Sequence, residues 1–314
     1  MTLPTADAPF FVVLNPGSGR DDAHETKALI ERVLTEAGRA HEVLMCAGTP
    51  VPQVAMKAVE RACAEGGIVV AAGGDGTINA VVQAVLGRGC ALGVLPQGTF
   101  NYFGRVHGIP LDTEAATRAL LDATVEPVQV GQVNDRVFIV NASVGLYPQL
   151  LEDREAYKQR YGRHRLVALW SAVVTLFRAH RPLRMVMRCG GEERNVRTLT
   201  LFVGNNPLQL RQIGLPEAPL IGGGRLAAVM LRPVGTLPLL RLLLQGALGR
   251  LGEADDVLSF PFEELSARPA LPRRRAMVKV AVDGEIIQLR APLRFAAAPE
   301  PLPLLVPRHP QPVA

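Results

Sequence analysis

The sequence predicts an α/β domain with a doubly wound parallel sheet, followed by a mainly antiparallel β domain. Over residues 1–126, short apolar runs alternate with helix-length segments, which is typical of parallel strands joined by right-handed helical crossovers. From Pro127 onward, strand-like stretches with a period of two dominate, and this pattern favours antiparallel pairing. A chain of 314 residues also exceeds the usual size of one domain. We therefore expect domains at residues 1–126 and 127–314.

The first half contains four apolar runs that we expect to be strands, namely Phe10–Leu14, Val43–Cys46, Ile68–Ala72 and Leu92–Leu95. Apolar residues recur at helical spacing from Ala23 to Gly38, where Gly38 is the expected C-cap, and again from Val54 to Ala62. A third helical pattern runs from Ile78 to Val85. Ligands of such a sheet bind beyond the C-terminal ends of its strands.

The second half contains four strand-like stretches, Arg136–Asn141, Arg197–Val203, Arg225–Leu231 and Met277–Val282, with helices expected at about Gly162–Ala179 and Leu237–Leu251. The tail after Ala298 carries six prolines, too many for a regular element. We expect the last several residues to be poorly ordered; the alternative is a C-terminal strand that returns to the first domain.

Composition excludes several classes of protein. The formal net charge of +5 favours anionic partners such as nucleotides or membrane surfaces. Aromatic residues make up only 5% and no recognised module is present, so we expect no nucleic-acid binding. The four cysteines form no CxxC pair, which argues against a zinc site or a disulfide framework. No stretch approaches the roughly 18 apolar residues of a spanning helix, and no signal peptide is recognised.

We therefore expect a cytoplasmic protein whose membrane contact would be peripheral, at the inner membrane surface. The region from Leu151 to Arg184 is basic and contains an apolar run. A core helix with a solvated basic flank is favoured there over a surface that docks on anionic membrane. Arg273, Arg274 and Arg275 are interpreted as a solvated turn.

Two of the expected strands run into glycine-rich loops suited to phosphate. Residues 15–19 read Asn-Pro-Gly-Ser-Gly, whose N–H groups and Ser18 hydroxyl suit phosphate oxygens, although an ordinary turn explains them equally well. Residues 73–77 read Gly-Gly-Asp-Gly-Thr before a helix, which favours a phosphate cradle over an incidental turn. Phosphate alone would repel Asp75, so this acid indicates a bridging Mg²⁺ or a contact with a substrate hydroxyl.

A third loop and a late acidic pair complete the candidates. In the loop from Pro96 to Arg105, Gly98 frees the turn, and Thr99 and Asn101 offer hydrogen-bonding groups for a nucleotide. The alternative is that Thr99 is a helix N-cap and that the aromatic residues belong to the core. Residues 282–286 read Val-Asp-Gly-Glu-Ile, and a hairpin turn is favoured there. At a phosphate site, however, Asp283 and Glu285 would accept a proton from an attacking hydroxyl or hold a metal.

Together these segments resemble the diacylglycerol kinase catalytic domain family of bacterial lipid kinases, which is related to sphingosine and ceramide kinases. Residues 73–77 look like its GGDGT signature and residues 95–101 like its LPxGTxN segment. Residues 141–145 and 282–285 resemble two further family stretches. GGDGT alone is shared with NAD kinases and phosphofructokinases, whereas the combination with LPxGTxN and a late DGE is more specific. The resemblance spans nearly the whole chain.

The resemblance implies an NAD kinase/phosphofructokinase-like first domain, a β-sandwich second domain, and ATP bound in the cleft between them. Asp75 would organise Mg²⁺ and the phosphates, and either Asp283 or Glu285 would be the general base toward the hydroxyl of a lipid substrate. The implied nucleotide contacts are Asn15, Pro16, Ser18, Thr49, Gly73, Gly74, Asp75, Gly76, Thr77, Asn79, Gly98, Thr99 and Asn101.

One stretch departs from the family. Many bacterial members bind a structural Mg²⁺ around an Asp-Gly pair in the second domain, but residues 220–226 read Leu-Ile-Gly-Gly-Gly-Arg-Leu. Because Mg²⁺ requires oxygen ligands that include carboxylates, we expect no such site here. Two alternatives to a lipid kinase stay open, a kinase for a soluble metabolite similar to NAD kinase and a nucleotide-binding protein without catalysis. No motif encodes the acceptor lipid or the oligomeric state.

Overall fold

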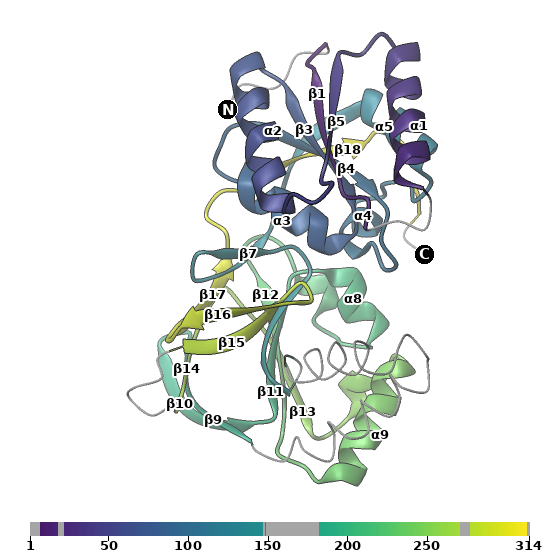
Figure 1. The fold of residues 1–314 in the computed structure, drawn as a ribbon. Helices are drawn as coiled ribbons and strands as arrows, with labels where there is room; N and C mark the ends of the chain where they lie inside the picture. Colours follow the sequence, from purple (N-terminus) through teal and green to yellow (C-terminus); the bar gives the residue numbers. More distant parts are fainter. Residues whose placement is uncertain (1–6, 18–21, 147, 149–181, 271–276, 313–314) are drawn as a thin grey trace. The chain divides into compact units, whose positions relative to one another are not determined.

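The computed structural model describes residues 7–17, 22–146, 148, 182–270 and 277–312. Ser18, the expected helix at Gly162–Ala179 and the arginines at 273–275 lie outside the described residues. The chain divides into two compact units (Figure 1). Unit 1 comprises Met1–Val130 and Ala298–Ala314, and unit 2 comprises Gly131–Ala297.

Unit 1 is built on a six-stranded sheet with the order β2-β1-β3-β4-β18-β5. Strands β1 to β4 are parallel to their neighbours, β18 is parallel to β4, and β5 is antiparallel to β18. The strands are β1 (Phe10–Leu14), β2 (His41–Met45), β3 (Ile68–Gly73), β4 (Ala91–Pro96), β5 (Ala123–Val128) and β18 (Leu302–Pro307). The predicted parallel α/β sheet is thus confirmed.

Helices cover both faces of this sheet. Helix α1 packs with α5, and α2 packs with α3, on opposite sides of the sheet in Figure 1. The helices are α1 (Ala23–Glu36), α2 (Val51–Glu65), α3 (Asp75–Val85), α4 (Tyr102–Val106) and α5 (Thr113–Leu121). Because both faces are covered, β1, β3 and β4 are buried along their whole length, which explains their unbroken apolar runs.

A glycine caps the second helix but not the first. Gly66 caps α2 in the left-handed conformation, with φ 65°, which glycine adopts without a Cβ penalty. Gly38, the expected C-cap of the first helix, also has φ 65°, but the helix ends at Glu36 and Ala37 is its cap.

The expectation of an irregular proline-rich tail is wrong. Residues Leu302–Pro307 form β18, which lies between β4 and β5. Along a strand, residues an even number of positions apart direct their N–H groups to the same side. Pro303 and Pro307 therefore remove donors from only one side of β18, and Leu302, Leu304 and Val306 keep theirs. The spacing of the prolines, rather than their number, makes the strand possible.

Unit 2 contains two six-stranded antiparallel sheets, with the orders β10-β9-β14-β17-β6-β7 and β13-β12-β11-β8-β15-β16. Large apolar residues from both sheets, including Phe138, Met185, Leu201 and Phe295, form one buried core, so the sheets pack face to face. The strands are β6 (Gly131–Val133), β7 (Arg136–Phe138), β8 (Asn141–Gly145), β9 (Leu183–Cys189), β10 (Glu192–Thr198), β11 (Thr200–Gly204), β12 (Leu226–Leu231), β13 (Val257–Phe262), β14 (Glu264–Pro269), β15 (Met277–Val282), β16 (Glu285–Arg290) and β17 (Leu293–Ala297).

Two expected strands of unit 2 are each divided. The stretch Arg136–Asn141 splits into β7 and the start of β8, because the Asp283 carboxylate, in the turn between β15 and β16, accepts the N–H groups of residues 139–141. The stretch Arg197–Val203 splits between β10 and β11. There the Thr198 hydroxyl donates to the carbonyl oxygens of Thr200 and Leu231. These hydrogen bonds stabilise the sharp turn between β10 and β11.

The described helical elements of unit 2 are α8 (Pro207–Gln212), α9 (Thr236–Ala247) and two 3₁₀ turns, η1 (Ala218–Leu220) and η2 (Leu251–Glu253). The expected helix Leu237–Leu251 corresponds to α9, which ends four residues earlier at Ala247. Among the described residues, no helix has the length and apolar character needed to cross a bilayer.

Candidate active site

Three loops of unit 1 leave the sheet at the same edge. Strands β1, β3 and β4 are neighbours, and their register places Leu14 beside Ala72 and Gly73 beside Pro96. The strands therefore end level with one another, and the segments after Leu14, Gly73 and Pro96 begin side by side. This is the edge at which a parallel sheet binds its ligands.

Glycines allow the loops after β3 and β4 to touch through their backbones. A Cβ atom on Gly98 would lie 2.8 Å from the Gly74 Cα, and one on Gly74 would lie 3.2 Å from the Gly98 Cα. A Cβ atom on Gly73 would collide with the Thr77 side chain. The Gln97 N–H also donates to the Gly73 carbonyl oxygen at 2.9 Å. These glycines are required for close approach between the two loops.

Asn15 joins the loop after β1 to helix α3. Its side-chain nitrogen donates to the Thr77 hydroxyl oxygen at 2.8 Å, and its side-chain oxygen accepts from the Gly17 N–H at 3.2 Å. Thr77 is buried in the first turn of α3. Gly74, the N-cap, provides no side-chain cap, so N–H groups of this turn are suited to an anionic ligand.

Asn101 fixes the shape of the loop after β4. Its side-chain oxygen accepts from the Gly98 N–H at 2.7 Å, and its side-chain nitrogen donates to the Gly98 carbonyl oxygen at 2.9 Å. The residue is buried with φ 51°, a left-handed conformation that Asn tolerates better than most residues. Asn101, and not Thr99, is the N-cap of α4, which corrects the alternative interpretation of this loop.

Asp75 binds the start of α4. Its two carboxylate oxygens accept from the Tyr102 N–H at 3.2 Å and the Phe103 N–H at 3.1 Å. Burial raises the pKa of the Asp75 carboxyl above its usual value, and the N–H groups of Phe103 and Tyr102 oppose that shift. Asp75 therefore connects the first turn of α3 to the loop after β4.

In unit 2, Asp283 and Gly284 form the hairpin turn between β15 and β16, with φ 45° and 89°, as the sequence predicts. The Asp283 carboxylate accepts three backbone N–H groups, from Ile139 at 2.7 Å, Val140 at 2.9 Å and Asn141 at 2.8 Å. The carboxylate thus holds the hairpin against the start of β8. Glu285, two residues later, is exposed.

Residues 9–133 match the family model of the diacylglycerol kinase catalytic domain. This part of the chain is similar to the catalytic domains of that family. The diacylglycerol kinase of Bacillus subtilis (strain 168) is 37% identical over 145 residues, which cover 45% of this chain and 47% of that protein. The "Probable lipid kinase YegS-like" of Pseudomonas aeruginosa (strain PAO1) is 47% identical over 94 residues, covering 29% and 31%. The aligned regions thus span less than half the length of these relatives.

A solved structure is similar over almost the whole chain. It is that of a diacylglycerol kinase from Bacillus anthracis str. Sterne, with a TM-score of 0.68, 17% identity, and coverage of 96% of this chain and 97% of that one. At this identity the similarity is one of fold. It extends the likeness from the diacylglycerol kinase catalytic domain to unit 2.

The other residues expected to bind nucleotide lie around the same edge of unit 1. Pro16, Gly76 and Asn79 are partly buried, and Thr49 and Thr99 are exposed. Sequence reasoning missed the aromatic pair in the loop after β4. Phe100, which the alternative interpretation placed in the core, is 61% exposed and stacks on Tyr102 with ring centroids 5.5 Å apart. An aromatic residue inside a nucleotide loop was the available signal for a stacking surface.

The residues fit one of the two Mg²⁺ ions that the family implies. Unit 1 offers the Asp75 carboxylate and the Thr77 hydroxyl beside the phosphate loops, and Mg²⁺ in kinases is held by one or two carboxylates plus substrate phosphates. The structural site in unit 2 does not fit. Gly222, Gly223 and Gly224 contribute backbone only, and the described residues contain no group of three acids, histidines or cysteines that would hold a metal.

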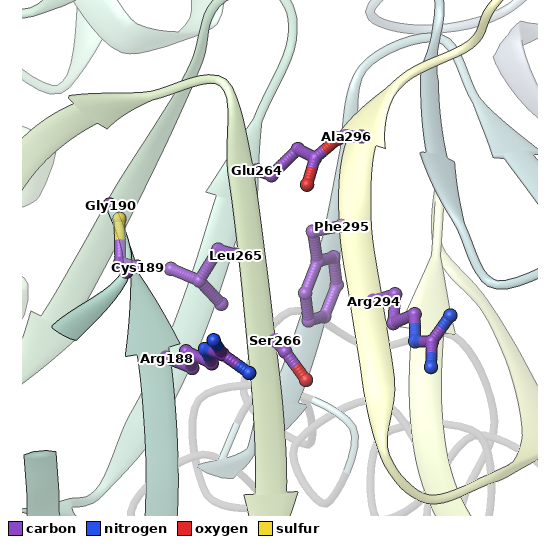
Figure 2. Close-up of a pocket in the computed structure, with 10 residues that line it drawn as sticks. Arg188, Cys189, Gly190, Glu264, Leu265, Ser266, Arg294, Phe295 and Ala296 are labelled. Carbon is purple, nitrogen blue, oxygen red and sulfur yellow. The ribbon is translucent and has the colours of Figure 1, made fainter. Parts of the chain in front are cut away.

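Unit 2 has two hollows that contain none of the expected site residues. One, of about 560 Å³, lies over β9, β14 and β17, where Ser266 stands between Arg188 and Arg294 (Figure 2). The other, of about 950 Å³, runs along α9 and is lined mainly by leucines. The first is polar and the second apolar, so they suit different partners.

Proposed function

We propose that the protein is an ATP-dependent kinase that phosphorylates a hydroxyl group of diacylglycerol or a similar lipid. The interlocking of the Gly73–Thr77 and Gly98–Asn101 loops carries this proposal, because it builds a phosphate-binding edge inside the part of the chain that matches the diacylglycerol kinase catalytic domain. The names of the aligned relatives support a lipid acceptor. The exposed leucines of α9 support it independently, since they suit contact with the membrane in which a lipid substrate lies, and a soluble metabolite requires no such contact.

In the proposed reaction, the N–H groups in the first turn of α3 bind the phosphates of ATP, and Asn15 holds Thr77 in position. Asp75 orders the loop after β4 and would also bind Mg²⁺. When bound, Mg²⁺ would neutralise charge on the phosphates. The lipid hydroxyl attacks the terminal phosphorus, the bond to the bridging oxygen breaks, and ADP leaves.

A general base must take the proton of the attacking hydroxyl, and we propose Glu285 for this role. Asp283 accepts three backbone N–H groups, so its carboxylate oxygens are already occupied by the backbone. Glu285 is exposed, and its carboxylate makes no hydrogen bond or ion pair with the described part of the chain. Asp283 then acts as a positioning residue that sets the hairpin carrying Glu285.

The proposal is tested with the purified full chain, ATP, Mg²⁺ and a panel of diacylglycerol, sphingoid bases and ceramide in detergent micelles. ADP release only in the presence of a lipid is the expected result, and an Asp75→Asn variant should lose most of the turnover. NAD in detergent-free buffer tests the soluble-substrate alternative. ADP release with NAD and with none of the lipids would replace the lipid-kinase proposal. ATP binding without any turnover would favour the nucleotide-binding protein without catalysis.

If the substrate is a lipid, the protein works at a membrane. We accordingly propose a cytoplasmic protein that contacts the inner membrane surface peripherally.

A further inference from the structure

Helix α9 presents leucines on two sides. Leu239 and Leu242 are buried against unit 2, as in any amphipathic helix that packs on its own domain. A second set points outward, with exposed fractions of 79% for Leu237, 52% for Leu240, 44% for Leu243 and 61% for Leu244, and 64% for Leu248 at the C-cap of the helix. We name these five residues the leucine stripe. A helix that is apolar on both sides is typical of burial on both sides.

The charges around the stripe suit a phospholipid surface. No acidic residue lies within α9, and the charged residue that it carries is Arg241, which is exposed. Leucines on one face together with an arginine are typical of helices that lie in the membrane interface. Acids occur only after the helix ends. Of these, Glu253 is paired with Arg250 at 2.7 Å, and Glu253, Asp255 and Asp256 line the same hollow as the leucines.

We propose that the leucine stripe is the surface by which the protein enters the boundary between the head groups and acyl chains of a phospholipid bilayer. This inference rests on the proposed function, because diacylglycerol resides in bilayers and its kinase must meet it there. A bilayer covers all five leucines at once without a shape-matched partner. Insertion of this kind depends on apolar burial, so binding should persist at high salt.

The described residues of unit 2 also include a rival surface, which would bind membranes by charge instead. On the outward side of β9, β14 and β17, Arg188, Ser266 and Arg294 lie in one row across the sheet (Figure 2), and Arg188, Arg268 and Arg294 are exposed. Binding through this face would fall steeply with salt, because exposed charges are screened within about 10 Å at 0.1 M ionic strength. The two surfaces therefore make opposite predictions.

The test is co-sedimentation of the full chain with phosphatidylcholine vesicles and with mixed phosphatidylcholine–phosphatidylglycerol vesicles, at low and high salt. The double variant Leu240→Gln/Leu244→Gln should bind at least about tenfold more weakly, since two exposed leucines lose their burial in lipid. Glutamine keeps helix propensity and both positions are exposed, so melting temperature should not change. Arg188→Gln/Arg294→Gln is the comparison variant and should bind like the parent protein.

Three results would overturn the inference. These are no binding of the parent protein to either vesicle, loss of binding only in the arginine variant, or a leucine variant that changes the oligomeric state and binds vesicles normally. The last would assign the stripe to a second copy of the chain. Turnover of a short-chain diacylglycerol in micelles separates this inference from the proposed function. The leucine variant should retain that turnover, whereas a failure of the proposed function removes it from the parent protein too.

An independent observation concerns two cysteines of unit 1. The Sγ atoms of Cys63 and Cys90 lie 3.5 Å apart. Cys63 is exposed in the last turn of α2, and Cys90 is buried just before β4. Burial raises the pKa of the Cys90 thiol to about 12, so Cys63 is the thiol that reacts first with reagents in solution.

We infer that Cys63 and Cys90 form an intramolecular disulfide when a two-electron oxidant such as hydrogen peroxide reaches Cys63. The Cys63 thiolate attacks a peroxide oxygen, the O–O bond breaks, and the leaving hydroxide takes up a proton to become water. The Cys90 sulfur then attacks the resulting Cys63 sulfenic acid, the S–O bond breaks, and a second water leaves. Two thiols and one peroxide thus give one disulfide and two waters.

The oxidised full chain should lose the mass of two hydrogen atoms, and peptide mapping should join the segments around residues 63 and 90. Its melting temperature should rise by several degrees and return after reduction, because the cross-link closes a loop in the unfolded chain. The exposed Cys63→Ser variant should show neither change. Stable sulfenic or sulfinic Cys63 beside a free Cys90, or a disulfide between two molecules, would overturn this inference.

Discussion

The side-chain amide of Asn15 donates a hydrogen bond to the Thr77 hydroxyl oxygen at 2.8 Å, and this contact joins the loop after β1 to the first turn of α3. The two residues are 62 positions apart, yet both follow neighbouring parallel strands. The bond therefore belongs to the proposed phosphate-binding edge and connects two segments that are distant in the sequence.

Asn15→Ala and Thr77→Val should each lower the free energy of unfolding and raise the KM for ATP several-fold. Because the two side chains are partners, the double variant should lose less than the sum of the single variants, by about 1 kcal/mol. Chemical denaturation of the four proteins measures this coupling. Strictly additive losses would mean that the hydrogen bond contributes nothing to stability.

Gly98→Ala should disrupt the site without touching a charged group. The added Cβ would lie 2.8 Å from the Gly74 Cα and 2.9 Å from the Asn101 side-chain oxygen, so the two loops must move apart. We expect a loss of about 2 kcal/mol in stability and at least tenfold weaker ATP binding. Thermal melting and nucleotide titration measure both quantities.

Gly246→Ala is the control for this substitution. Gly246 lies inside α9, where an added Cβ would meet Leu251 at an ordinary 3.8 Å. Alanine in a helix interior should stabilise the protein by about 0.5–1 kcal/mol and leave ATP binding unchanged. Unaltered ATP binding in Gly98→Ala would show that the close packing of the two loops is not needed for the nucleotide.

The sequence predicted the elements whose signals are local. Strand β1 has the predicted bounds Phe10–Leu14, because both faces of the sheet are covered and the apolar run is unbroken. The convergence of three loops followed from the parallel order of the strands. The turn at Asp283 and Gly284 was equally readable, since Asp-Gly between apolar runs selects a hairpin.

Other features depend on partners far away in the chain. The atoms that Asp75 binds lie 27 and 28 residues later, and Cys63 meets Cys90 across 27 positions. No motif marks either pair. The strand at Leu302–Pro307 was only the alternative interpretation of the tail, for a different reason. A high proline content argues against a strand in general. Whether a strand can form depends on which N–H groups must pair with its neighbours, and these are known only when the neighbouring strands β4 and β5 are known.

His107 should make stability fall in mild acid. Its ring packs edge-on against Phe103, with centroids 4.8 Å apart, and burial lowers the pKa of the imidazole to about 4. The folded protein therefore favours neutral His107, whereas the unfolded chain binds a proton near pH 6.5. The contribution of His107 to the free energy of unfolding is therefore fully present above about pH 6.5 and is lost as the pH falls toward 4.

Between pH 7 and pH 5 the free energy of unfolding should fall by about 1–2 kcal/mol. This range allows for the partial exposure of His107, which reduces the effect of burial on its pKa. Denaturation of the parent protein and of His107→Gln at several pH values measures it. The stability difference between the two proteins should shrink as the pH falls. A difference that stays constant across this range would mean that His107 has the same pKa in the folded and unfolded states.

Substitutions at Asp283 should lower stability, whereas substitutions at Glu285 should lower turnover with little effect on stability. Asp283→Ala leaves the N–H groups of Ile139, Val140 and Asn141 without their acceptor, so we expect a loss of about 2–4 kcal/mol in stability and reduced turnover. Glu285→Gln removes an exposed carboxylate and should leave stability within about 0.5 kcal/mol of the parent. If Glu285 is the general base, kcat should fall at least about 100-fold in Glu285→Gln.

Two measurements decide the assignment, thermal melting and ADP release with diacylglycerol in micelles. Glu285→Asp should recover part of the turnover because it keeps a carboxylate, whereas Asp283→Asn should recover part of the stability because its amide oxygen still accepts from the backbone. If Glu285→Gln retains full activity and Asp283→Asn is stable but inactive, the base is Asp283. That outcome would require its carboxylate to exchange a backbone hydrogen bond for the substrate hydroxyl, a change that the three N–H groups now oppose.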